Sequence, residues 1–198
     1  EDEVAAVNSR SLRWATLIFA PIYAAWTVFD YALAPAQYGT FLLFRLAACA
    51  LNLAVLALVW RRPAASIRAY WIWFYVWGAL VAPMLPWVGP SFLAYTIGFC
   101  IVIFGAGAIP LWPPRMAASV VAAIVVTALI AIVGHPPAVA VRDFIAAGFA
   151  VVSVTAVAVV TSWLKFTLTR QEFEARSALA REQAETTRLR DAEQAKAQ

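Results

Sequence analysis

The stretch Phe144-Ile-Ala-Ala-Gly-Phe-Ala-Val-Val-Ser-Val-Thr-Ala-Val-Ala-Val-Val-Thr-Ser-Trp163 decides the fold of this chain. It is about as long as a helix must be to cross a bilayer. It continues without Pro or Gly into Leu164-Lys-Phe-Thr-Leu-Thr-Arg-Gln-Glu-Phe-Glu-Ala-Arg-Ser-Ala-Leu-Ala-Arg-Glu-Gln183, which is rich in good helix formers. The sequence therefore predicts one helix that leaves a membrane and continues into water.

The composition of the whole chain agrees with this prediction. Of its 198 residues, 64% are hydrophobic and 13% are charged, whereas soluble domains carry about 45–50% apolar and about 25% charged residues. We therefore expect an integral membrane protein. The basic excess lies at the rims of the apolar segments and gives no indication of nucleic-acid binding. Cys49 and Cys100 fall inside predicted spans, so we interpret them as packing residues and not as a disulfide.

Five apolar segments precede the quoted stretch, and short turns separate them. The second segment stops at Arg61-Arg62-Pro63, and the six predicted spans cover residues 12–33, 41–60, 69–85, 92–111, 116–133 and 144–163. One set of span ends carries most of the basic residues, and the positive-inside rule assigns that side to the cytoplasm: Arg10, Arg13, Arg61, Arg62, Arg68, Arg115, Lys165 and Arg170. On the other side only Arg142 lies in a loop.

These boundaries predict an all-α membrane protein with both termini in the cytoplasm. We expect a cytoplasmic lead over residues 1–11, six transmembrane helices with short loops over 12–165, and a cytoplasmic helix over 166–198 that resembles a coiled coil. The helical pattern reaches Gln198 without a cap or a breaker. We therefore interpret the chain as the membrane half of a longer receptor.

Two charged residues, besides Arg13 at the edge of the first span, lie within predicted spans, where a charge is costly unless it finds a partner or reaches the interface. Asp30 is near the end of the first span, and Arg45 is about one turn into the second span from the same side. Three interpretations are open: the two residues pair and fix the packing of the helices, both side chains reach out to the interface, or they anchor the head group of a ligand.

Aromatic residues crowd the third span. Trp73 and Trp77 are four residues apart and share one helical face at mid-depth. Together with Trp26, Trp87 and Tyr95 they form a candidate apolar pocket near Asp30 and Arg45. Ordinary packing or contact with lipid is the alternative.

Residues for catalysis are missing from the sequence. His135 is the single histidine, and there is no carboxylate pair, nucleotide-binding loop or Cys-x-x-Cys motif. We expect no catalytic site, metal site or cofactor in this fragment, and we interpret His135 as a solvated loop residue. Gly98, Gly105 and Gly107 permit close helix contact, either within the bundle or between two copies of the chain.

The segment after Trp163 has the features of a signalling helix. Oppositely charged residues lie at helical spacing: Arg170 with Glu174, Glu172 with Arg176, Arg181 with Glu185, Glu185 with Arg188, and Arg190 with Glu193. A seam for dimerisation runs through Leu168, Ala175, Leu179 and Leu189, but Glu172, Glu182 and Thr186 also lie in it. Such a seam favours a marginally stable parallel dimer that can switch, with Trp163, Phe166, Arg170 and Phe173 relaying movement into it.

Six short-looped spans followed by a charged helix resemble the membrane-associated sensor (MASE-like) domains of bacterial signalling proteins. The ending Thr187-Arg-Leu-Arg-Asp-Ala-Glu-Gln-Ala-Lys-Ala-Gln198 is similar to the run that enters the dimerisation helix of sensor histidine kinases. The resemblance implies a homodimeric sensor in the bacterial inner membrane. Its output would be a histidine kinase, a diguanylate cyclase or a nucleotide cyclase.

Six-helix sensors of quorum-sensing kinases suggest a small lipophilic signal molecule. The leading hypothesis is therefore a sensor of a two-component histidine kinase, and the close alternative is the same sensor on a cyclase. A small transporter and a plain membrane anchor are the other hypotheses. A transporter is disfavoured because the predicted membrane centre offers few polar groups beyond Asn52.

Overall fold

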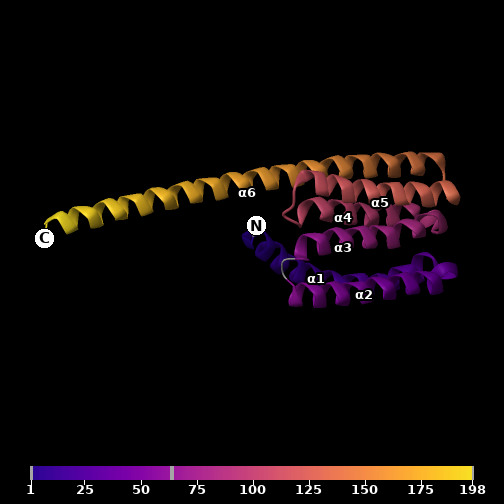
Figure 1. Ribbon diagram of the computed structural model, residues 1–198. Coiled ribbons are helices and arrows are strands. Elements are labelled where there is room, and N and C mark those ends of the chain that lie inside the picture. Colours follow the sequence, from indigo (N-terminus) through magenta and orange to yellow (C-terminus); the bar gives the residue numbers. More distant parts are fainter. Residues whose placement is uncertain (1, 63–64, 198) are drawn as a thin grey trace.

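A computed structural model of the chain describes residues 2–62 and 65–197, with side chains described from residue 6 to residue 188. Its long helices are α1 (Asp2–Leu33), α2 (Tyr38–Arg61), α3 (Ser66–Val81), α4 (Phe92–Ala108), α5 (Pro114–Gly134) and α6 (Val141–Ala197). They lie side by side in an up-and-down bundle (Figure 1). Within the described residues, six helical segments are long and apolar enough to span a membrane. The predicted all-α fold with six spans is confirmed.

Prolines explain where several helices end. The third predicted span consists of α3 and a 3₁₀ helix, η3 (Ala82–Trp87). Pro83 has no N–H to continue α-helical hydrogen bonding, so the chain tightens there. Short 3₁₀ helices η1 (Pro35–Gln37) and η4 (Gly89–Ser91) begin the second and fourth spans. Pro114 occupies the first turn of α5, where a missing N–H costs nothing. Pro63, which was expected to end the second span, lies outside the described residues.

The beginning of the chain is more ordered than a polar lead suggests. Helix α1 starts at Asp2, well before the predicted span. Asn8 and Ser9 are buried in the bundle. The Asn8 side chain donates a hydrogen bond to the carbonyl oxygen of Leu111 and accepts one from its N–H, each at 2.8 Å. This part of α1 is therefore a packed element that holds the connection between α4 and α5.

Helix α3 is the centre of the bundle. It contacts α1, α2, α4 and α5, while α1 packs mainly on α2 and α4 packs mainly on α6. Its side chains form an aromatic core, since Trp73 lies 5.3 Å from Trp77 and 4.8 Å from Phe74 between ring centroids. Tyr70 is fully buried and shares a 2.8 Å hydrogen bond with Ser11. The aromatic run of the third span thus mostly serves packing.

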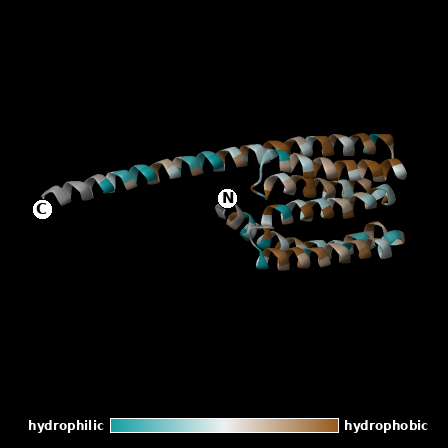
Figure 2. Cartoon of the chain, viewed as in Figure 1, coloured by the Kyte–Doolittle hydropathy of each residue, from teal (hydrophilic) through white to brown (hydrophobic). Residues whose placement is uncertain are grey.

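Helix α6 continues far beyond the other five. It has 57 residues, which corresponds to about 85 Å at 1.5 Å per residue. In Figure 1 the extension leaves the bundle at the end where α1 begins. Figure 2 shows that α6 is mostly hydrophobic beside the bundle and mostly hydrophilic along the extension. One helix therefore links the apolar bundle to a polar region, as the opening stretch predicts.

Candidate functional site: a polar cluster beside an apolar cavity

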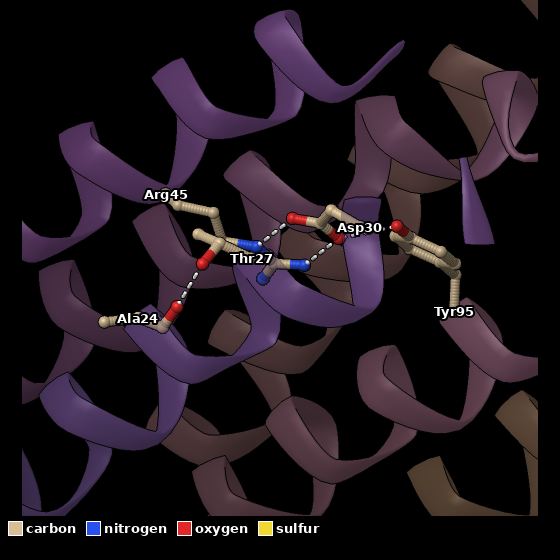
Figure 3. Close-up of polar contacts among 5 residues, drawn as sticks. All are labelled: Ala24, Thr27, Asp30, Arg45 and Tyr95. Carbon is tan, nitrogen blue, oxygen red and sulfur yellow. Dashed lines mark hydrogen bonds and ion pairs between the residues drawn. The ribbon is translucent and has the colours of Figure 1, made fainter. Parts of the chain in front are cut away.

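Asp30 and Arg45 form a buried ion pair between α1 and α2 (Figure 3). Arg45 Nε lies 2.8 Å from Asp30 Oδ2, and Arg45 Nη2 lies 2.9 Å from Asp30 Oδ1. The two side chains are 3% and 0% exposed, so neither reaches out to the interface. Two parallel bonds of this kind are the strong, directional form of an ion pair. The prediction that these residues pair is confirmed.

Tyr95 joins the pair from α4. Its hydroxyl donates a hydrogen bond of 2.5 Å to Asp30 Oδ1, so three helices meet at one carboxylate. The Arg45 guanidinium also lies over the rings of Tyr23 and Trp26, 4.3 Å and 5.5 Å from their centroids. Cation–π contact of this kind stabilises a charge that has left water. Figure 3 further shows the Thr27 hydroxyl bonded to the Ala24 carbonyl within α1, apart from the cluster.

A cavity of about 90 Å³ lies beside this cluster. Its wall combines side chains from four helices, and the residues are Phe19, Ile22, Tyr23 and Trp26 of α1, Arg45 of α2, Trp77 and Val81 of α3, and Tyr95, Gly98, Ile101 and Val102 of α4. The structure thus brings four predicted pocket residues together at one cavity: Trp26, Arg45, Trp77 and Tyr95. Asp30 supports the cavity through its bonds to Arg45 and Tyr95.

Two predicted pocket residues lie elsewhere. Trp73 is 1% exposed and donates its indole N–H to Asn52, so it belongs to the core beneath the cavity. Trp87 stacks on His135 at a centroid distance of 4.0 Å. It is half exposed and does not line the cavity. It is the last residue of η3, beyond the end of α3 and away from the helix faces that meet at Arg45.

Sequence reasoning missed Tyr23, which is buried against both Arg45 and Trp77. Tyr23 lies three residues before Trp26 and seven before Asp30, a spacing that places all three on one face of a helix. The role of Gly98 was also missed. A Cβ at Gly98 would clash with the indole of Trp26, so the glycine makes room for that side chain. The contact between Gly98 and Trp26 is visible only in the structure.

Helix α4 connects the cavity to α6. A Cβ at Gly107 would clash with the backbone carbonyl of Ala158, so α4 and α6 are in direct backbone contact there. Gly105 faces the side chain of Phe74. These glycines serve packing within one chain.

Lys165 fastens α6 to the end of α4. Its ammonium group donates hydrogen bonds to the carbonyl oxygens of Ala108 and Ile109, at 3.1 Å and 2.8 Å. The last carbonyls of a helix have no partners within it and form its negative end, so a cation stabilises them. Two features of the sequence indicate this contact. Lys165 lies at the end of an apolar span, and Pro110 ends the fourth span on the same side of the membrane. The charge pattern of the sequence assigns Lys165 only to the basic rim.

The predicted relay residues make few contacts with the bundle. Trp163 and Phe173 are half exposed, Phe166 is partly buried, and Arg170 pairs with Glu174 on its own helix at 2.7 Å. The structure also contains the predicted pair of Arg176 with Glu172. It shows no ion pair among Arg181, Glu185 and Arg188, whose side chains are described. The predicted pair of Arg190 with Glu193 lies outside the described side chains.

The predicted dimer seam is unpaired in the single chain. Leu168, Ala175 and Leu179 are exposed on the extension of α6, and the side chain of Leu189 lies outside the described part. Among the described residues, no group of three or more His, Cys, Asp or Glu side chains is placed to hold a metal ion.

Comparison with known families agrees with this architecture. The structure combines six helices that could span a membrane, a small cavity among four of them and a long helical extension. A family model for the membrane-associated sensor domains called MASE8 matches residues 28–180. The match runs from the last turns of α1 into the extension of α6, and this chain belongs to the MASE8 family. No curated protein and no solved structure matches the chain.

Proposed function

We propose that this chain is the transmembrane sensor of a two-component histidine kinase. It detects a small apolar or amphiphilic molecule within the membrane and relays that event through α6 to a cytoplasmic catalytic domain. The observation that carries the proposal is the position of α4. Tyr95 and Gly98 of α4 line the cavity, and Gly107 at its other end touches the backbone of α6.

The mechanism follows from this connection. A ligand changes the equilibrium of a receptor only if it binds one conformation better than another. A molecule in the cavity touches α1, α2, α3 and α4, so it favours the arrangement in which those helices fit around it. Movement of α4 then displaces α6. The backbone contact at Gly107 and the hydrogen bonds of the Lys165 ammonium group prevent the two helices from moving independently.

We further propose a place and an assembly for the sensor. The N-terminus and the extension of α6 lie on the same side of the bundle (Figure 1), as do the end of α2 with Arg61 and the start of α5 with Arg115, which supports an inner-membrane protein with cytoplasmic termini. The exposed apolar side chains of Leu168 and Leu179 support a homodimer in which two α6 extensions pair. Only part of that seam is apolar, so the paired helices can exchange between two packings.

A nucleotide assay of the full-length protein tests the proposed output. The protein is reconstituted in lipid nanodiscs and incubated with labelled ATP or labelled GTP. A histidine kinase transfers the γ-phosphoryl group of ATP to a histidine of its own chain, which gives an acid-labile label on the protein. Formation of a cyclic dinucleotide from GTP, or of a cyclic mononucleotide, would instead identify the same sensor on a cyclase and contradict the kinase proposal.

A further inference from the structure

We propose that the cavity between α1, α2, α3 and α4 binds an uncharged amphiphile through a carbonyl oxygen in its head group. This inference rests on the proposed sensor function and specifies the chemistry of its signal. Three properties of the cavity carry it: unpaired hydrogen-bond donors in its wall, a charge balance of zero, and an apolar route to the lipid.

Two donors in the cavity wall have no partner. The indole N–H of Trp77 is buried without a hydrogen bond, and the buried hydroxyl of Tyr23, whose oxygen can accept from Arg45, has no acceptor for its own proton; each residue is only 5% exposed. An unpaired polar group is destabilising in a bilayer, because no water is there to replace the missing partner. Both residues line the cavity beside Arg45, and their rings lie 4.3 Å apart between centroids. A ligand oxygen at this place accepts from one or both of them.

The charges of the cluster favour a neutral ligand. Asp30 accepts from two nitrogens of Arg45 and from Tyr95, so the positive charge of Arg45 is already compensated. A carboxylate or phosphate would add a buried charge without a counter-ion, and so would an ammonium group. A carbonyl oxygen has two lone pairs, accepts from two donors and brings no charge.

The rest of the wall suits a hydrocarbon chain. Phe19, Trp26, Val81 and Val102 are apolar, while Ile22 of α1 and Ile101 of α4 are each half exposed on the surface that faces lipid. A chain anchored by its head near Trp77 can leave between these two isoleucines. The cavity of about 90 Å³ is well below the roughly 300–1,000 Å³ of sites that enclose a drug-sized ligand. It therefore holds the head and first carbons of a slender molecule.

A simple ketone of matching shape tests the inference. The chain in lipid nanodiscs is titrated with 2-undecanone carrying ¹³C at the carbonyl, and the carbonyl stretch is followed by isotope-edited infrared spectroscopy. We expect a second, lower-frequency band that saturates with the amount of protein and is absent from empty nanodiscs, because hydrogen bonding weakens the C=O bond. Native mass spectrometry should retain the ketone, but neither undecane nor undecanoate. Equal retention of undecane, or tighter retention of undecanoate, would overturn the proposal.

Conservative variants locate the interaction. Tyr23→Phe and Trp77→Phe each remove one donor while keeping an aromatic ring, and each should weaken ketone binding by about two- to tenfold, as expected for one lost hydrogen bond. Trp112→Phe is the matched control, since Trp112 also has a buried, unpaired N–H but does not line the cavity. It should leave binding unchanged. Binding that survives both cavity variants, or that is lost in the control alone, would refute the assignment. The nucleotide assay uses no ligand, so the sensor proposal can stand if this one fails.

Discussion

Arg45 is surrounded by an ion-pair partner and aromatic rings, and these contacts explain how its charge remains inside the bundle. A charged residue at the centre of a membrane helix costs about 2.5–3.5 kcal/mol on insertion scales. Asp30 neutralises the charge, Tyr95 bonds to the carboxylate, and the rings of Tyr23 and Trp26 lie against the guanidinium. The cluster joins α1, α2 and α4 at one point, and so sets the geometry of the cavity.

Breaking this pair should destabilise the bundle more than removing both charges. We expect Arg45→Met to lower the free energy of unfolding by about 3–5 kcal/mol, because Asp30 then remains buried without a counter-ion. The double variant Asp30→Asn with Arg45→Met should recover a large part of that loss. The measurement is SDS-induced unfolding in mixed micelles.

The exposed pair of Arg142 with Asp143 serves as the control for this series. Its side chains are 88% and 35% exposed and lie 3.4 Å apart. Asp143→Asn should change the free energy of unfolding by less than about 1 kcal/mol.

In the Asp30–Arg45 series, one outcome would contradict the prediction. If the double variant Asp30→Asn with Arg45→Met is as unstable as Arg45→Met alone, the charges of Asp30 and Arg45 do not compensate each other.

At the scale of the helices, the contact of α4 with α6 is the important feature. Gly107 allows the two backbones to touch, and Lys165 caps the last carbonyls of α4. Asn8 holds the following loop from the side of α1. The C-terminal end of α4 and the loop after it therefore contact both α1 and α6, the first and the last helix of the chain.

A methyl group at Gly107 should separate α4 from α6. In Gly107→Ala the new Cβ meets the carbonyl of Ala158, and backbone cannot move aside as a flexible side chain can. We expect lower stability in SDS titrations and an altered basal output of the full-length protein. Gly148→Ala is the control, because a Cβ at that position of α6 meets nothing. Equal behaviour of the two variants would contradict a tight contact at Gly107.

Removing the cap on α4 should change signalling more than folding. Lys165→Met keeps the length of the side chain but leaves the carbonyls of Ala108 and Ile109 without their donor. We expect a shifted basal output with a loss of stability of about 1–2 kcal/mol. Arg68→Met removes another basic residue of the same rim, where the side chain is exposed, and should leave output unchanged. Equal outputs of Lys165→Met and Arg68→Met would show that the contact of Lys165 with α4 does not affect signalling.

Residue patterns predict the elements better than they predict the contacts between them. Apolar length, prolines and basic rims located all six spans, and the cost of two buried charges predicted the pairing of Asp30 with Arg45. Tyr95, Trp77 and Trp26, which were grouped as aromatic residues of a candidate pocket, line one cavity. The Tyr23, Gly98 and Lys165 contacts depend on how the helices rotate about their axes, and six short-looped helices leave that rotation open. Trp87 was misplaced because α3 ends at Val81 and the 3₁₀ helix η3 changes the direction of the side chains that follow.

On the scale of the whole molecule, the extension of α6 is the part for which we propose a partner. It is about as long as the spanning part, and the three described apolar residues of its seam, Leu168, Ala175 and Leu179, are exposed in a single chain. An isolated helix without tertiary contacts is only marginally stable in water. Pairing with a second copy would bury Leu168 and Leu179, and it would let a small movement at the membrane reach the far end.

Cysteine cross-linking tests this homodimer. In a background with Cys49 and Cys100 replaced by Ala, we expect Leu179→Cys to form a covalent dimer rapidly in nanodiscs under mild oxidation. Arg181→Cys lies about 200° further around the helix and should cross-link several times more slowly. Similar rates at both positions, or no dimer at either, would contradict a seam through Leu179.

The central claim is that α6 carries the state of the bundle to an output domain. Insertions after Arg170 in the full-length protein test it most directly, with enzymatic output as the measurement. Seven alanines add length but keep the phase of the helix within about 20°, whereas two alanines rotate everything beyond them by about 200°. The account predicts that the seven-residue insertion keeps signal-dependent output and that the two-residue insertion locks or inverts it. Unchanged output in both variants would mean that α6 is only a tether and would contradict the account.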